Sequence, residues 1–151
     1  AGEAEHDTAL AIKQEVGIPV IANGDIDSPE KARFVLDYTG ADAIMIGRAA
    51  QGRPWIFSEV AGYLQTGVRP PSPPTDWIRD TLLIHLQELY GLYGEYLGVR
   101  VARKHVAWYC KGRRGAGRFR DGFNRSETPQ EQQRLIEEFF VGQPSREEHA
   151  A

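Results

Sequence analysis

The feature that most constrains the fold of this chain is a strand, helix and strand pattern near its start. Residues 18–22 and 43–46 are short apolar runs, each closed by glycine and polar residues, which is typical of parallel strands buried on both faces. Between them a helix is predicted to begin at Pro29 and to end at Gly40. Two strands cannot complete such a sheet, and a (β/α) barrel needs about 250 residues. We therefore expect this part to be the end of a longer parallel α/β protein.

Both predicted strands are followed by groups that suit an anionic ligand. Asn23, Gly24 and Asp25 follow the first strand, and Gly47 and Arg48 follow the second. The carboxyl ends of parallel strands meet at one edge of the sheet, where α/β proteins build their ligand sites. Glycine lets an anion approach the backbone, and arginine offers a forked cation to a phosphate. An ordinary turn explains the first group alone, but the two groups together predict a phosphate site on the last two strands of a barrel.

A proline-rich segment, residues 70–75, divides the chain into two parts of different charge. Residues 1–75 hold six basic and ten acidic side chains, whereas residues 76–140 hold eleven basic and nine acidic ones. Apolar side chains in the second part recur at helical spacing. The sequence thus predicts an α/β domain over residues 1–69, a linker, and an all-helical domain over residues 76–140.

The helical domain is predicted to open with one long helix. Thr75 and Asp76 cap it, it ends near Tyr96, and Gly98 breaks the chain after it. Other helices are expected at residues 7–16, 99–111, 117–123 and 129–140. The mostly polar residues 141–151 have little to bury, so we expect them to form a disordered tail.

Cationic side chains are concentrated between residues 99 and 125, where nine lysines and arginines stand against one acid, Asp121. At helical spacing several of them share one face of the predicted helix 99–111. A solvated helix face is the simpler reading, but the scarcity of acidic partners favours binding to the phosphates of a polyanion. Trp108 or Tyr109, if exposed, could stack on a base. The side chains predicted to contact the polyanion are Arg100, Arg103, Lys104, Lys111, Arg113, Arg114 and Arg118.

The remaining chemistry-bearing side chains are assigned to packing. His105 and Cys110 fall on the apolar side of their helix. His85 has Glu88 one turn along but lacks a third ligand, so no metal site is predicted. No apolar run approaches the eighteen residues of a membrane span, and the single cysteine favours a reducing compartment, so we expect a cytoplasmic protein.

Two sets of motifs resemble one known family. Residues 18–26 and 40–57 are similar to the last barrel segments of the tRNA-dihydrouridine synthases, most of all the bacterial B type. The basic and aromatic motifs within residues 100–109 and 119–124 resemble the tRNA-binding helical domain of the same family. The resemblance covers nearly everything from residue 2 to residue 140. It implies an α/β plus all-α fold, with the last two βα units of a (β/α)8 TIM barrel followed by a C-terminal helical bundle.

The resemblance also implies an activity. Members of this family are flavin enzymes that reduce particular uridines of tRNA to dihydrouridine, with FMN in the barrel and NADPH as the reductant. We also expect this protein to be a monomer. In the family a cysteine on an earlier barrel loop donates the proton. Cys110 does not match that position, so the catalytic residue is expected upstream of Ala1, and the chain alone is expected to be inactive. Carried over by position, the residues implied to bind FMN are Asn23, Gly24, Asp25, Gly47 and Arg48.

Two other functions remain open on the residues alone. The strand-end groups are shared by many FMN barrels, so an oxidoreductase that acts on a small molecule is one alternative. The other is an RNA-binding module without catalytic activity, because the cationic segment does not depend on the strand-end groups.

Overall fold

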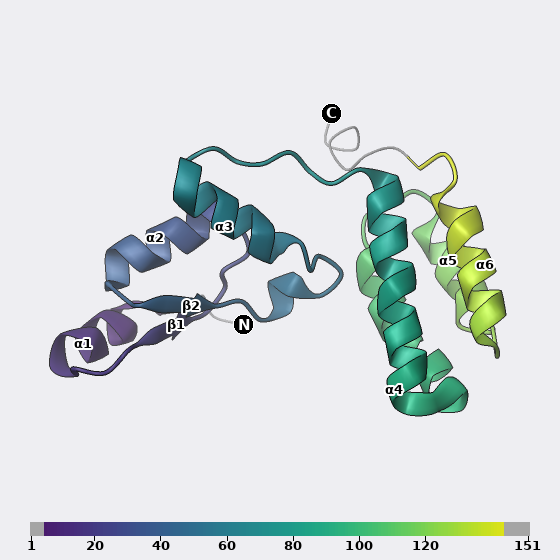
Figure 1. The fold of residues 1–151 in the computed structure, drawn as a ribbon, viewed down its shortest axis with the longest axis horizontal. Helices are drawn as coiled ribbons and strands as arrows, with labels where there is room; N and C mark the ends of the chain where they lie inside the picture. Colours follow the sequence, from purple (N-terminus) through teal and green to yellow (C-terminus); the bar gives the residue numbers. More distant parts are fainter. Residues whose placement is uncertain (1–4, 144–151) are drawn as a thin grey trace. The chain divides into compact units, whose positions relative to one another are not determined.

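The computed structural model describes residues 5–143, and the chain forms two compact units divided between Pro70 and Pro71 (Figure 1). The elements of the first unit are α1 (Asp7–Glu15), β1 (Ile21–Asn23), α2 (Pro29–Thr39), β2 (Ala43–Met45), the 3-10 turn η1 (Arg48–Ala50) and α3 (Ile56–Thr66). Those of the second are α4 (Thr75–Tyr109), α5 (Ala116–Phe123) and α6 (Pro129–Phe140). The described residues are thus mostly helical, with one parallel sheet of two strands. The (β/α)8 barrel and the C-terminal helical bundle that the sequence predicts remain predictions.

The sheet of the first unit is covered on one face only. Ala22 of β1 is buried in a core that includes Val35 of α2 and Ile56 of α3. The neighbouring positions on the strands point the other way, and there Ile21 and Met45 are 57% and 53% exposed. The described residues thus bury one face of the sheet, because their helices pack against a single face, and burial of both faces stays a prediction for the longer protein.

The boundaries of α2 are those that local sequence signals predict. Ser28 Oγ accepts a hydrogen bond from the backbone N–H of Lys31 at 3.1 Å, and Pro29 stands at the first helical position. At the other end Gly40 has a φ of 64°, and its N–H donates to the carbonyl of Leu36. The predicted helix is thereby confirmed.

β1 begins three residues later than predicted, because the chain before it is bonded differently. Pro19 has no N–H to donate, and the N–H of Val20 donates to the Asp42 carboxylate at 2.7 Å. Lys13 Nζ donates to the same carboxylate oxygen at 2.6 Å, and this hydrogen bond lowers the pKa of Asp42. Pairing between the two strands therefore starts at Ile21.

α4 is a helical hairpin rather than a single rod (Figure 1). Gly94 has φ 73° and ψ 163°, a conformation open almost only to glycine, and it separates two antiparallel arms, residues 75–93 and 95–109. The predicted break at Gly98 is wrong. Gly98 lies buried within the second arm, where an added Cβ would be 2.9 Å from Tyr90 Cα of the first arm. One glycine makes the turn, and the other allows the arms to touch.

The helix begins at Thr75, within the pair of residues expected to cap it. Pro74, with extended backbone angles, precedes the helix, and Thr75 is the first helical residue. The Asp76 carboxylate accepts a hydrogen bond from the N–H of Trp77 at 2.8 Å. Asp76 therefore lies inside the first turn, where the helix dipole favours a negative charge.

Gln132 of α6 joins both arms of α4. Its fully buried amide donates from Nε2 to the carbonyl of Val99 at 3.0 Å and accepts from the Tyr90 hydroxyl at 2.7 Å. Both ends of the amide are thus satisfied, which a buried polar group requires. The last two predicted helices are confirmed as α5 and α6, and Thr128 caps α6 by accepting from the N–H of Glu131.

The expected tail is only partly described. Gln143, just after α6, donates from Nε2 to the carbonyl of Arg114 at 3.0 Å. Residues 144–151 lie outside the described residues. Between residues 5 and 143, no helix has both the length and the apolar character that crossing a membrane requires.

Candidate functional site

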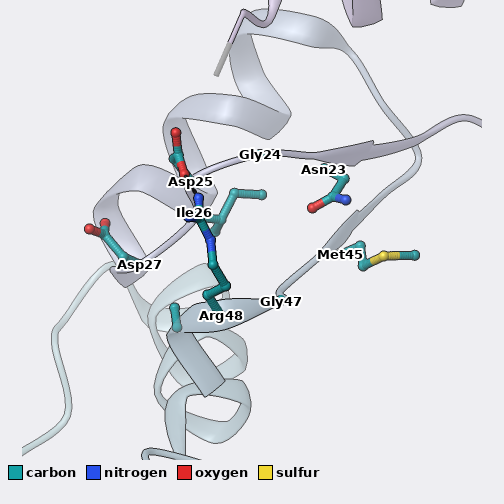
Figure 2. Close-up of a pocket in the computed structure, with 9 residues that line it drawn as sticks. Asn23, Gly24, Asp25, Ile26, Asp27, Met45, Gly47 and Arg48 are labelled. Atoms are coloured by element: carbon teal, nitrogen blue, oxygen red, sulfur yellow. Dashed lines mark hydrogen bonds and ion pairs between the residues drawn. The ribbon is translucent and has the colours of Figure 1, made fainter. Parts of the chain in front are cut away.

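A pocket of about 700 Å³ lies at the carboxyl ends of β1 and β2 (Figure 2). All five residues that the sequence assigns to a phosphate site line it, namely Asn23, Gly24, Asp25, Gly47 and Arg48. The other lining residues are Ile26, Asp27, Met45 and Ala49. Because the strands are parallel and paired, two segments that are distant in sequence form one concave surface.

An ion pair connects the two strand-end segments across the pocket (Figure 2). Arg48 Nη2 lies 2.8 Å from Asp25 Oδ1. Consecutive positive φ angles, 143° at Gly24 and 45° at Asp25, turn the chain here. The Arg48 side chain is 82% exposed, so the pair contributes at most about 1 kcal/mol to stability. Most of the guanidinium thus faces open space, where a second anion can reach it.

A second arginine, Arg53, which the sequence interpretation did not select, contacts the loop after β1 that lines the pocket. Arg53 Nη1 donates to the carbonyl of Asp27 at 3.2 Å, and Nη2 pairs closely with the carboxylate of Glu59 in α3. Glu59 is buried, and the ion pair with Arg53 gives its side chain a partner there. Arg53 therefore fixes the loop after β1 to the start of α3. The only signal in the sequence was the pair of opposite charges six residues apart, and nothing in that spacing indicates burial.

The cations of the second unit do not form one uniform surface. Arg103 is half-buried and donates from Nη2 to the carbonyl of Ser126 at 3.1 Å. Arg113 is only 5% exposed, and its guanidinium packs over the Phe140 ring at 4.8 Å. Helical spacing groups Arg103 with the surface cations, and the glycine-rich segment after the predicted helix does the same for Arg113, because neither pattern shows how later segments pack against these side chains. The predicted residues that are exposed are Arg100, Lys104, Lys111, Arg114 and Arg118.

Aromatic rings lie beside the exposed cations of α4. The guanidinium carbon of Arg100 is 3.7 Å from the centre of the Tyr96 ring, and Lys104 Nζ is 5.2 Å from that of Trp108. Tyr109, which the sequence offered as a stacking side chain, is buried, and burial raises the pKa of its hydroxyl to about 12. Of the two aromatic side chains first considered for stacking, only Trp108 is accessible.

Two histidines meet between the arms of α4. The rings of His85 and His105 are 4.7 Å apart in an edge-to-face arrangement, and His85 Nδ1 lies 3.4 Å from the Tyr109 hydroxyl. Burial lowers the pKa of both imidazoles, so both are neutral at pH 7. Cys110 is fully buried, as predicted. Within residues 5–143 no three His, Cys, Asp or Glu side chains gather in a way that could hold a metal ion.

Both the pocket and the exposed cations of the second unit lie within the residues that one family model matches. The model of the dihydrouridine synthase (Dus) family matches residues 1–143. The chain belongs to this family. The resemblance seen in the strand-end and helical motifs is thereby confirmed, and the candidate pocket and surface are those of a dihydrouridine synthase chain.

Similar curated dihydrouridine synthases come from several bacteria. The chain is 58% identical over 139 residues to tRNA-dihydrouridine synthase B of Shewanella oneidensis and 55% identical over 139 residues to that of Vibrio vulnificus. It is 56% identical over 140 residues to the protein of the same name from Pseudomonas aeruginosa. These matches cover 92–93% of this chain but only 42–43% of the relatives. The chain thus spans about two fifths of their length.

Proposed function

We propose that this chain is the C-terminal portion of a tRNA-dihydrouridine synthase of the B type, which reduces particular uridines of tRNA to 5,6-dihydrouridine. The observation that carries the proposal is the identity of 55–58% to relatives named tRNA-dihydrouridine synthase B, extending over 92% of the chain. In this proposal residues 1–69 complete a (β/α)8 barrel, and residues 76–140 form the tRNA-binding domain. The enzyme works in the cytoplasm as a monomer.

The pocket residues fit the phosphate end of FMN. Arg48 offers an exposed cation, and beside it the Cα of Gly47 faces open space, since an added Cβ there would meet no atom within 4 Å. A phosphate can therefore approach the backbone and the guanidinium together. Asp25 keeps its hydrogen bond to one nitrogen of Arg48 and orients the remaining N–H groups. When bound, FMN supplies the chemistry that passes hydride from NADPH to the uracil ring.

In this proposal the chain's own residues bind and position FMN and tRNA, and none of them is assigned to the chemical step. Cys110, buried in the helical unit, is not the family's proton donor. Lys104 and the other exposed cations of residues 100–118 are proposed to hold tRNA phosphates, which makes the affinity depend steeply on salt. The relatives' name specifies tRNA, which argues against the small-molecule oxidoreductase, and no observation favours a non-catalytic module.

The test uses the full-length enzyme that contains this sequence. Arg48→Ala should weaken FMN retention by about 10- to 150-fold, because a charge-assisted phosphate contact of about 1.5–3 kcal/mol is lost. Arg69→Ala is the matched control, since Arg69 is another exposed arginine of the first unit with a carboxylate neighbour, Glu30, at 4.0 Å. Flavin absorbance after dialysis measures retention.

The activity is tested in cells. Deletion of the gene should remove dihydrouridine from specific tRNA positions, measured by mass spectrometry, and the wild-type gene should restore it. Purified enzyme without flavin, or unchanged dihydrouridine after deletion, would overturn the proposed function. Equal flavin retention in the Arg48 and Arg69 variants would overturn the role of Arg48 alone.

A further inference from the structure

Four side chains on the second arm of α4 recur about once per helical turn and form what we term the aromatic–cation row. Its members, Tyr96, Arg100, Lys104 and Trp108, follow one another at intervals of four residues. Residues at this spacing are neighbours on one helix face, and the row extends for about 18 Å along the axis. The row thus combines two aromatic rings with two cations on one surface.

The first pair of the row forms a stacked layer. The Arg100 guanidinium lies 3.7 Å from the centre of the Tyr96 ring, and its Nη1 donates to the Tyr96 carbonyl at 2.9 Å. The two contacts hold the guanidinium over the face of the ring. Tyr96 is nevertheless 69% exposed. A planar group is therefore held ready at the surface, in the arrangement that a nucleobase uses when it stacks on arginine or on an aromatic ring.

The second pair of the row is Lys104 and Trp108, and histidines of the hairpin pack against the Trp108 ring. Lys104 Nζ lies 5.2 Å from the centre of the Trp108 ring, and the ring meets the neighbouring His105 edge to face at 5.1 Å. His105 is in turn held by His85 of the first arm. The ring thus has a defined orientation, while the exposed ammonium is free to approach a phosphate.

We propose that the aromatic–cation row binds unpaired nucleobases of an RNA strand, which stack on the layer of Arg100 and Tyr96 while Lys104 contacts a neighbouring phosphate. This proposal rests on the proposed function, because it names the part of the RNA that the helical unit reads. Charge selects the occupant, since seven exposed basic residues and one acid between residues 99 and 125 suit a polyanion better than an apolar protein surface. Stacking requires bases that are free of a duplex, so loop nucleotides are the target.

The experiment compares RNA probes on the full-length enzyme. The probes are a single-stranded RNA of adenosine and uridine with 2-aminopurine at one position, and a blunt RNA duplex with the same number of phosphates. Wild-type enzyme should quench the 2-aminopurine fluorescence of the single strand and bind it more tightly than the duplex. Equal affinity for both probes, without quenching, would overturn the proposal.

Variants separate stacking from charge. Tyr96→Leu should weaken binding of the single strand by about 5- to 100-fold with an unchanged salt slope, because a stacking surface is lost and no charge is removed. Tyr96→Phe should restore binding. Arg100→Lys, which keeps the charge and loses the plane, should also weaken it. If Arg100→Lys binds as the wild type does and Tyr96→Leu has no effect, the row contacts phosphates only, and the proposal fails.

Controls distinguish this failure from that of the proposed function. Tyr93→Leu removes another exposed tyrosine outside the row and should leave RNA binding unchanged. Circular dichroism should show equal helix content in the Tyr96 and Tyr93 variants, since both side chains are at the surface. If Tyr96→Leu loses flavin or changes the oligomeric state while binding RNA normally, the row is a protein contact and the proposal is overturned. The proposed function stands in that case as long as the wild type binds tRNA and forms dihydrouridine.

Discussion

Replacing Gly98 by alanine should loosen the α4 hairpin. The new Cβ would lie 2.9 Å from Tyr90 Cα and 3.1 Å from the Leu89 carbonyl oxygen, whereas carbon atoms in contact are about 3.5–4.0 Å apart. Both blocking atoms are backbone, so the arms must separate by about 0.6–1 Å. Overpacking costs about 1–3 kcal/mol, at the upper end where backbone must move, and the higher helix propensity of alanine offsets about 1 kcal/mol. We expect a net loss of about 1–2 kcal/mol.

Gly91 offers a matched control in the same hairpin. It lies on the first arm of α4, is exposed, and an added Cβ would meet no atom within 4 Å. Gly91→Ala should therefore stabilise the helix by about 0.5–1 kcal/mol, because alanine loses less backbone entropy on folding. The two substitutions are chemically identical and lie seven residues apart, yet they should act in opposite directions.

Amide hydrogen exchange over residues 75–109 of the full-length enzyme measures the effect locally, without assuming that the protein unfolds in one step. A loss of 1–2 kcal/mol corresponds to about 5- to 30-fold faster exchange in Gly98→Ala. Exchange in Gly91→Ala should be about 2- to 5-fold slower. Slower exchange in both variants would refute the close contact between the arms at Tyr90.

Three further predictions concern charge. Lys104→Gln should reduce the slope of log tRNA affinity against log salt by about 1, because one phosphate contact is lost, and a binding titration over a range of KCl concentrations measures it. Arg53→Lys should lower FMN retention, because lysine cannot hold both the pocket loop and Glu59; retention equal to wild type would contradict this role. Burial lowers the pKa of His85 and His105 from 6.5, so the unfolded chain binds protons more tightly than the folded one. Stability of the helical unit should therefore fall as pH drops below about 6.5, and hydrogen exchange at two pH values should show a smaller fall in the double variant His85→Gln, His105→Gln.

Local signals were sufficient where one residue determines one backbone feature. Ser28, Pro29 and Gly40 each act on their own turn, so the bounds of α2 could be read from the sequence. The pocket could also be anticipated, because parallel pairing must bring the ends of two neighbouring strands together. Both predictions rest on rules that need no knowledge of distant packing.

Features that depend on distant partners could not be read in this way. Gly94 and Gly98 are equivalent in a helical pattern, and only the structure, with φ 73° at Gly94 and the close approach of Gly98 to Tyr90, shows which of them turns the chain. Arg113 belongs to a basic, glycine-rich segment that suggests a surface loop, but the ring of Phe140 lies against its guanidinium. The role of a side chain in these cases is decided by elements that follow later in the sequence.

The open face and free edges of the sheet bear on how this protein can be handled. Two paired strands leave unsatisfied backbone groups along their outer edges, and Ile21 and Met45 add apolar surface beside them. Such edges are templates for association between copies. We expect the first unit, when produced without neighbouring strands, to self-associate and precipitate, and we expect cleavage between Pro70 and Pro71 to yield a helical unit that stays in solution.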